Sequence, residues 1–200
     1  MLKFYNNKKV LITGCTGFKG TWLSRILINT GAVVTGYALE PPTEPSLFKL
    51  IKLNKQMKSI TGDIRDLAKL QKTIIKERPE IVIHMAAQPL VRESYKDPVT
   101  TYETNVMGTV NILEACKKTP SVRSIVNVTT DKVYENMEWD RGYKEEDVLN
   151  GHDPYSNSKS CSELVTSSYK KAFYAEIDAP SLSTARSGNV IGGGDFSQDR

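Results

Sequence analysis

The feature that most constrains what this chain can fold into is a glycine-rich segment near the N-terminus, TGCTGFKG at residues 13–20. It follows a short apolar run and overlaps the start of residues 17–30, where apolar residues recur at helical spacing, so it joins a predicted strand to a predicted helix. Gly14 permits a tight turn, Gly17 lets the backbone approach a pyrophosphate, and Gly20 allows close packing of helix on sheet. The segment therefore predicts dinucleotide binding, with the phosphates at the helix N-terminus.

Strand-like and helix-like segments alternate along the rest of the chain. Strands are expected at residues 10–13, 32–39, 57–60, 81–83, 124–128 and 182–191. Helices are expected at residues 17–30, 64–77, 98–113 and 154–173, with one or two helical turns at 46–53. This order predicts an α/β protein with a doubly wound parallel sheet of the Rossmann type. Since 200 residues make about one domain, residues 1–200 are expected to form a single dinucleotide-binding domain.

Composition and charge argue against several classes of protein. The net charge is +4 and the basic residues are scattered, so nucleic-acid binding is not favoured. No apolar stretch approaches the ~18 residues that span a bilayer, and the N-terminus has no apolar region of a signal peptide, so we expect a cytoplasmic protein. Cys15, Cys116 and Cys161 are widely spaced and are expected to be buried or half-buried thiols. With only two histidines as well, no metal site is predicted.

The second and third predicted strands bear on the choice of cofactor. Tyr37 and Glu40 stand near the place where an acidic residue normally binds the ribose 2′-hydroxyl, and no arginine nearby suggests a 2′-phosphate pocket. This favours NAD over NADP. Asp63 follows the third strand and has two open roles: it could cap the helix expected from residue 64, or bind the adenine amine.

A tyrosine and a lysine at the start of the last predicted helix suggest redox chemistry. Tyr155 and Lys159 are four residues apart and share one helix face, so the cation would lower a tyrosine pKa that is normally ~10. Such a tyrosine can take a proton from an alcohol while a hydride leaves for nicotinamide.

Three polar residues close the fifth strand, at the edge of the sheet where ligands bind in doubly wound folds. Thr130 could share the substrate oxygen with Tyr155. Asp131 and Lys132 are candidates for an acid and a base; the alternative is a loop-capping aspartate and a solvated lysine.

These motifs resemble those of the extended short-chain dehydrogenase/reductases that act on nucleotide sugars. The segments that carry the resemblance are TGCTGFKG (13–20), HMAAQPLVRESY (84–95), TTDKVY (129–134), GHDPYSNSK (151–159) and RSGNVIGGGDFSQDR (186–200). The Thr130-Asp131 pair resembles the Thr-Asp pair that marks the 4,6-dehydratases. Lys132 stands where the dTDP-glucose and GDP-mannose enzymes carry Glu and, with the GGGD and DR sequences near the end of the chain, indicates the CDP-glucose branch.

The resemblance implies a role for each catalytic candidate. Tyr155 would be the base for the sugar 4-hydroxyl, and Lys159 would lower its pKa and hold the nicotinamide ribose. Thr130 would hydrogen-bond the 4-oxygen, Asp131 would protonate the departing 6-hydroxyl, and Lys132 would assist removal of the C5 proton. The hydride would return from C4 to C6, so NAD is regenerated.

The resemblance also implies binding residues and partners. The cofactor-binding residues would be Gly14, Gly17, Phe18, Lys19, Gly20, Asp63, Ile64, Ala86, Ala87, Gln88, Asn105, Tyr155 and Lys159. The substrate-binding residues would be Gln88, Thr130 and Asn189, the last near the phosphates of the nucleotide sugar. We also expect a homodimer and a C-terminal substrate domain that is largely missing from these 200 residues. Two alternatives stay open: a nucleotide-sugar 4-epimerase, which needs no charged pair at 131–132, and an NAD-binding module without turnover.

Overall fold

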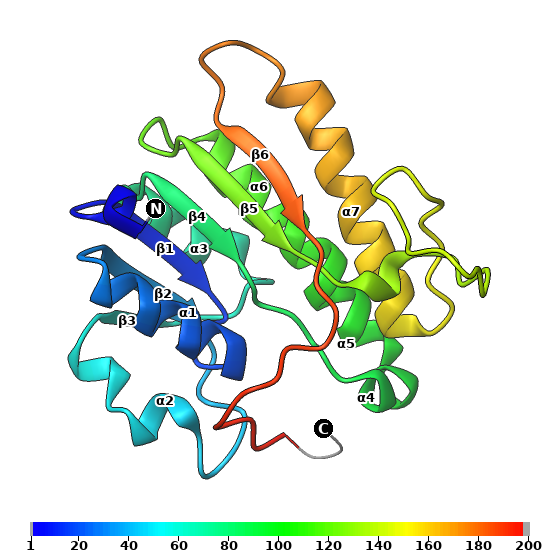
Figure 1. Ribbon diagram of the computed structural model, residues 1–200. Helices are drawn as coiled ribbons and strands as arrows, with labels where there is room; N and C mark the ends of the chain where they lie inside the picture. Colours follow the sequence, from blue (N-terminus) through cyan, green and yellow to red (C-terminus); the bar gives the residue numbers. More distant parts are fainter. Residues whose placement is uncertain (1, 198–200) are drawn as a thin grey trace.

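The computed structural model describes residues 2–197 as one parallel six-stranded sheet with helices on both faces (Figure 1). The strands are β1 Lys9–Thr13, β2 Val33–Ala38, β3 Lys58–Thr61, β4 Ile81–His84, β5 Ser124–Val128 and β6 Ser181–Ala185. They lie in the order β3-β2-β1-β4-β5-β6, which reverses direction between β1 and β4. This is the doubly wound arrangement, so the predicted fold class is confirmed.

Helices connect the strands and cover the sheet. They are α1 Phe18–Asn29, α2 Leu47–Leu50, α3 Leu67–Glu77, α4 Val91–Lys96, α5 Pro98–Tyr102, α6 Gly108–Lys117 and α7 Pro154–Phe173. A π-helix, η3 Glu103–Met107, lies between α5 and α6, and short 3₁₀ turns lie at η1 Leu2–Tyr5, η2 Leu53–Lys55 and η4 Asp131–Val133.

Alternating side chains of the strands form two apolar cores. On β1, Val10 and Ile12 pack with Leu27 of α1, whereas Leu11 packs on the other face with Leu70 of α3. Because both faces are covered, the central strands read as continuous apolar runs instead of alternating ones.

Both Asp-Pro pairs begin helices as predicted. The Asp97 carboxylate accepts a hydrogen bond from the Thr100 amide at the start of α5, and Asp153 accepts from the Ser156 amide at the start of α7. In each case proline occupies the first turn, where its missing N–H costs nothing.

Several expected boundaries were wrong. The helix expected from residue 64 begins at Leu67, because Asp66 is the residue that caps it, through the Lys69 amide. The predicted helix after Pro98 is interrupted by the π-helix, and α4 was not predicted.

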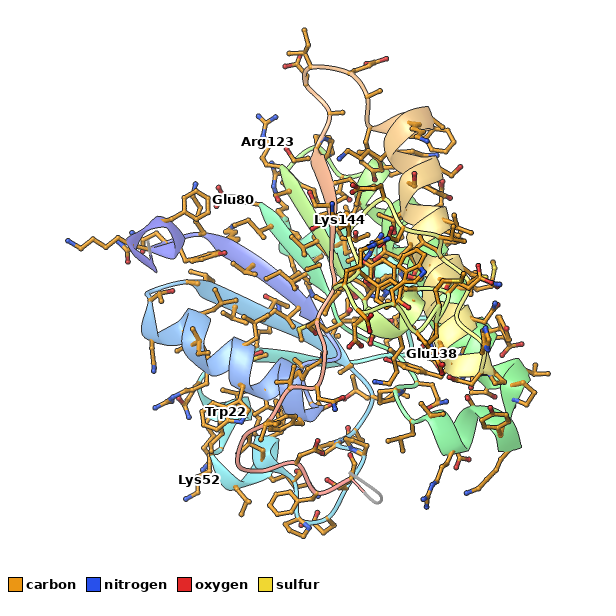
Figure 2. All side chains as sticks on the ribbon, turned by 45° about the vertical axis from the view of Figure 1, so that its right-hand side comes forward. Trp22, Lys52, Glu80, Arg123, Glu138 and Lys144 are labelled. Atoms are coloured by element: carbon orange, nitrogen blue, oxygen red, sulfur yellow. The ribbon has the colours of Figure 1, made fainter. Side chains whose placement is uncertain are left out.

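The sixth strand was expected over residues 182–191 but ends at Ala185. The chain then leaves the sheet and crosses toward α1 and α2, where the Trp22 indole donates a hydrogen bond of 3.0 Å to the Gly193 carbonyl (Figure 2). The two residues of the final DR sequence, Asp199 and Arg200, lie outside the described residues.

All three cysteines are free thiols, Cys15 and Cys116 buried and Cys161 half-buried, as expected. Within residues 2–197 no helix combines the length and the apolar character needed to cross a membrane.

Candidate functional site

The three glycines of the turn between β1 and α1 serve different purposes. Gly14 has a φ of +73°, and a Cβ there would lie 2.8 Å from the Ala86 nitrogen. A Cβ on Gly20 would lie 2.2 Å from the Gly14 carbonyl oxygen, so these two glycines are required by the fold itself. A Cβ on Gly17 would meet nothing closer than 3.5 Å.

Gly17 is also the N-cap of α1, and no side chain caps that helix end. The protein therefore leaves space, and a helix start that no side chain caps, where a pyrophosphate would lie, which fits a bound dinucleotide. Phe18 and Lys19 follow within the first turn of the helix.

Gly17→Val is expected to fold normally and to lose NAD binding, because the new side chain enters only the space that the pyrophosphate would need. Calorimetric titration with NAD measures the affinity, and thermal unfolding checks the fold. The control is Gly20→Ala, which is expected to destabilise the protein because its Cβ meets backbone. Unchanged affinity in Gly17→Val would show that the cofactor does not approach this turn.

At the expected adenosine end of the site, the contacts of Asp63 and Tyr37 differ from those predicted from the sequence. The Asp63 carboxylate accepts hydrogen bonds from Arg65 (Nη2 at 2.7 Å), which hold the pKa of Asp63 below its usual value, and it does not cap α3. Tyr37 is fully buried and its hydroxyl donates to the Asp63 carbonyl, whereas Glu40 at the surface accepts from Thr61 Oγ1. Of Tyr37 and Glu40, the surface residue Glu40 is therefore the better placed to meet a ribose.

The loop after β4 carries the next group of predicted residues. Thr13 Oγ1 accepts hydrogen bonds from the amides of Met85 and Ala86, at 3.0 and 3.1 Å, and so fixes the start of the loop. The next residue in the loop, Ala87, is half-buried. Ile64, from the loop after β3, is buried beside the helix face that carries Gly108.

Asn105 and Gln88 are joined to each other. The buried Asn105 amide accepts from the Gln88 nitrogen (2.8 Å), donates to the Gln88 carbonyl (3.1 Å), and reaches Ser158 Oγ on α7 (2.8 Å). The Gln88 side chain is engaged with Leu90 and Thr101. The structure therefore brings Gln88, Asn105 and helix α7, which carries Tyr155 and Lys159, together. Binding of substrate by Gln88 stays a prediction.

A buried histidine lies beneath this loop. Thr13 Oγ1 already accepts two backbone amides, so its own hydrogen points to His84 Nδ1, 2.7 Å away. Nε2 then carries the ring proton and faces Thr109 Oγ1 at 3.5 Å. Burial, with the nearby Lys159 charge, lowers the pKa of His84 to about 3, so the ring is neutral.

The neutral histidine predicts an acid-sensitive fold. Because the folded pKa lies below the unfolded one, the unfolded chain takes up a proton first, and stability is lost as pH falls from ~6.5 toward 3. Linkage gives a loss of about 2 kcal/mol between pH 7.5 and pH 5. Urea unfolding at both pH values should show this loss, and His84→Gln should remove that dependence. The exposed His152→Gln is the control. A ring resonance of His84 titrating near pH 6.5 would contradict the assignment.

Tyr155 and Lys159 lie in the first two turns of α7, as expected. The Tyr155 amide donates to Ser94 Oγ of α4, which ties the start of this helix to its neighbour. Lys159 is 5% exposed and its Nζ donates to the Val128 carbonyl, the last residue of β5, at 3.4 Å. Burial and the Lys19 charge lower the pKa of Lys159 to about 8, against the opposing effect of Glu163.

Thr130, Asp131 and Lys132 follow β5 directly. Thr130 Oγ1 caps the short turn by accepting from the Lys132 amide, so the loop-capping role weighed for Asp131 belongs to Thr130. The Asp131 carboxylate is exposed, accepts from Thr130 Oγ1 at 3.1 Å, and lies 3.8 Å from Lys132 Nζ.

A cavity of about 360 Å³ opens beside this acidic side chain. Its lining residues are Asp131, Tyr134, Glu145, Thr184, Arg186, Ser187 and Gly188. Asn189, the predicted phosphate-binding residue, is exposed in the segment that leaves β6. The arrangement places a carboxylate, an amine and a hydroxyl at one edge of the sheet, next to the helix that carries Tyr155.

Behind this edge the buried Glu163 forms an ion pair with the half-buried Arg186, and neither residue was predicted. The signal that could have found Glu163 is its position one helical turn after Lys159. Its partner follows β6 and could be identified only in three dimensions.

The glycine turn, the strand order and the Tyr155–Lys159 pair together define an extended short-chain dehydrogenase/reductase. Within that class the chain belongs to the family described as GDP-mannose 4,6 dehydratase, which it matches over residues 11–188.

Individual relatives agree with this placement. A CDP-glucose 4,6-dehydratase of Salmonella typhimurium is 53% identical over 98% of this chain and 56% of its own length. A dTDP-D-glucose 4,6-dehydratase of Dictyostelium discoideum is 30% identical over 83% of this chain and 41% of its own. The crystal structure of a UDP-glucose 4-epimerase from Brucella ovis in complex with NAD superposes with a TM-score of 0.72 at 26% identity, covering 90% of this chain and 51% of that one. The chain thus spans about half the length of these relatives.

Proposed function

We propose that the protein is a nucleotide-sugar 4,6-dehydratase that converts CDP-glucose to CDP-4-dehydro-6-deoxyglucose and water, with NAD as its cofactor. The observation that carries this proposal is the Asp131–Lys132 pair, with Nζ and Oδ1 3.8 Å apart, of which Asp131 lines the cavity. The 53% identity to a CDP-glucose 4,6-dehydratase supports the choice of substrate. Residues 1–200 would supply the cofactor half of the enzyme.

The site residues account for each proton that must move. Tyr155 takes the proton of the 4-hydroxyl, and Thr130 holds the same oxygen. The glycine turn at residues 13–20 would hold NAD, whose chemistry would be to take up the hydride of C4 and to supply it to C6. The ketone at C4 makes the C5 proton acidic. Elimination needs the proton of the pair on Asp131 and a neutral Lys132: Lys132 then assists removal of the C5 proton while Asp131 protonates the 6-hydroxyl, which departs as water, and a proton returns to C5 when C6 is reduced.

The charged pair separates this proposal from its alternatives. A 4-epimerase returns the hydride to C4 and eliminates nothing, so it has no use for an acid and a base at C6 and C5. A module that only binds NAD has no use for a carboxylate exposed beside a cavity.

The proposal is tested by incubating the protein with NAD and CDP-glucose and measuring products by mass spectrometry. The 200-residue chain is compared with a chimera in which the C-terminal part of the Salmonella relative follows residue 200. Loss of one water from CDP-glucose supports the dehydratase. An isomer of unchanged mass supports the epimerase, and NAD binding without turnover in either form supports the module.

The protein is also proposed to be a cytoplasmic homodimer. Its free thiols are typical of a reducing compartment. Val99 on α5 and Leu164 on α7 are 66% and 57% exposed, on helices that pack against each other, and a second copy of the chain would bury them there.

Leu164→Glu is expected to convert the dimer to a monomer, because a carboxylate cannot be buried there without a partner. Light scattering coupled to size exclusion measures the mass. Leu50→Glu, at an equally exposed position on α2, is the control and should leave the dimer intact. A monomeric parent protein would refute the proposed assembly.

A further inference from the structure

A buried carboxylate lies one helical turn beyond Lys159 on α7. The Glu163 side chain is 4% exposed, and a carboxylate so placed needs charge-assisted hydrogen bonds to offset its desolvation. Arg186 donates two, from Nε to Oε1 at 3.0 Å and from Nη2 to Oε2 at 3.1 Å. Thr129 Oγ1 donates a third, also to Oε1. Both carboxylate oxygens are thus held by groups from outside the helix.

These hydrogen bonds join the three elements that form the edge of the site. Thr129 is the first residue after β5, and Arg186 is the first after β6. Beyond the sheet the two segments stay side by side, since the Asp131 amide donates to the Ser187 carbonyl at 3.0 Å. Through its hydrogen bonds to Thr129 and Arg186, Glu163 holds the two segments that follow β5 and β6 against α7.

Arg186 extends the connection to the cavity wall. Its Nη1 donates to Tyr134 Oη at 2.8 Å and to the Glu145 carbonyl at 3.0 Å. Both acceptors belong to residues that line the cavity beside Asp131. A bidentate pair fixes the plane of the guanidinium as well as its position. By orienting Arg186, Glu163 therefore also helps to position the cavity-lining residues that Arg186 contacts.

The same carboxylate is one of the charged groups facing Lys159. Lys19 opposes the lysine charge, His84 is neutral, and Glu163 favours it. Burial alone would raise the pKa of Glu163, but the hydrogen bonds from Arg186, Thr129 and Thr184 outweigh it, so the carboxyl is ionised.

We propose that Glu163 is a positioning residue of the site: it holds the Thr129–Val133 segment, with its acid and base, against the helix that carries Tyr155 and Lys159. It acts through Thr129 and Arg186 and lies behind the reacting groups. The effect of Glu163 on catalysis rests on the proposed dehydratase function, whereas its hydrogen bonds to Thr129 and Arg186 do not depend on that function.

The first test compares Glu163→Gln with Glu114→Gln. Glu114 also accepts hydrogen bonds from a cation and a hydroxyl, Lys117 and Tyr169, but on α6 away from the cavity. Lysine NMR of the 200-residue chain follows the Lys159 titration. The midpoint should fall by at least ~0.5 pH unit in Glu163→Gln, because a neighbouring negative charge is lost. It should stay unchanged in the control.

Turnover is measured in whichever form of the protein is active. Displacement of reacting groups by about 1 Å can cost ~10²-fold in rate. Glu163→Gln should therefore lower kcat by roughly 10- to 100-fold while KM and NAD affinity change by less than about 3-fold, since no ligand contact is removed. Glu114→Gln should keep its kcat.

Thr129 gives a second, milder pair of variants in case Glu163→Gln does not fold. Thr129→Val keeps the shape of the side chain and loses the hydrogen bond to Glu163, whereas Thr129→Ser keeps the hydroxyl. Loss of kcat in Thr129→Val with retention in Thr129→Ser supports the proposal.

Either of two results would overturn the positioning role of Glu163. One is an equal kcat in the two Thr129 variants, and the other is a Glu163→Gln protein that matches Glu114→Gln in both kcat and the Lys159 midpoint. If the parent protein turns over no nucleotide sugar, the proposed function fails. The Lys159 midpoint, together with the amide shifts of residues 129–133 in Thr129→Val and Thr129→Ser, still decides the positioning role.

Discussion

Tyr155→Phe is expected to lower the rate of oxidation at C4 by ~10²–10⁴-fold, the usual contribution of a positioned general base. The substitution removes one hydroxyl. The start of α7 should survive, because Asp153 caps it and Ser94 holds the Tyr155 amide. The measurement is a single-turnover assay of nicotinamide reduction by CDP-glucose, in the chimera with the longer relative if the 200-residue chain is inactive.

Tyr169→Phe is the matched control for this prediction. Tyr169 is on the same helix, and its hydroxyl donates to Glu114 at 2.9 Å, away from the cavity. Its loss should leave the oxidation rate unchanged. If Tyr155→Phe oxidises substrate within a few-fold of the parent, Tyr155 has a structural role only.

Asp131→Asn is expected to preserve oxidation and block loss of water. Asparagine keeps the shape of the side chain but has no acidic proton for the departing 6-hydroxyl, and hydroxide is a poor leaving group. Tyr155, Lys159 and the glycine turn are untouched. Reduced nicotinamide should therefore accumulate on the enzyme, seen by its absorbance, while mass spectrometry detects no dehydrated sugar.

The control for this variant is Asp140→Asn, an exposed aspartate on the loop between β5 and α7. It should form product at the parent rate. Product formation at the parent rate by Asp131→Asn would remove the residue that best separates the dehydratase proposal from an epimerase.

Both predictions depend on residues that were identified from the sequence, and local spacing explains why that was possible. Tyr155 and Lys159 share a helix face because they are four residues apart, and the Asp-Pro sequence before them is a helix start. The glycine spacing of residues 13–20 likewise specifies a turn within eight residues. From such short-range signals the order of strands and helices, and with it the fold class, could be predicted.

The sequence also indicated that Asp131 lies at the carboxyl edge of the sheet, because it directly follows a strand. Its exposed carboxylate depended on the rest of the structure, since Thr130 is the residue that caps the turn. The end of β6 was not predictable either. Val190 and Ile191 are β-branched and apolar, as strand residues often are, but the chain has already left the sheet there and crosses toward Trp22.

By itself, then, the sequence determined the strand–turn–helix that would hold a dinucleotide, the order of strands and helices, and the Tyr155–Lys159 pair, because each depends on residues a few positions apart. The tertiary structure alone decided which carboxylate is buried and which ring is neutral. The hydrogen bond between Glu163 and Arg186 joins residues that are 23 positions apart in the sequence, and the one between His84 and Thr13 joins residues that are 71 positions apart. Partners so far apart leave no periodic pattern in the sequence. The free energy of burying a charge or an imidazole depends on whether the folded chain places a partner beside it.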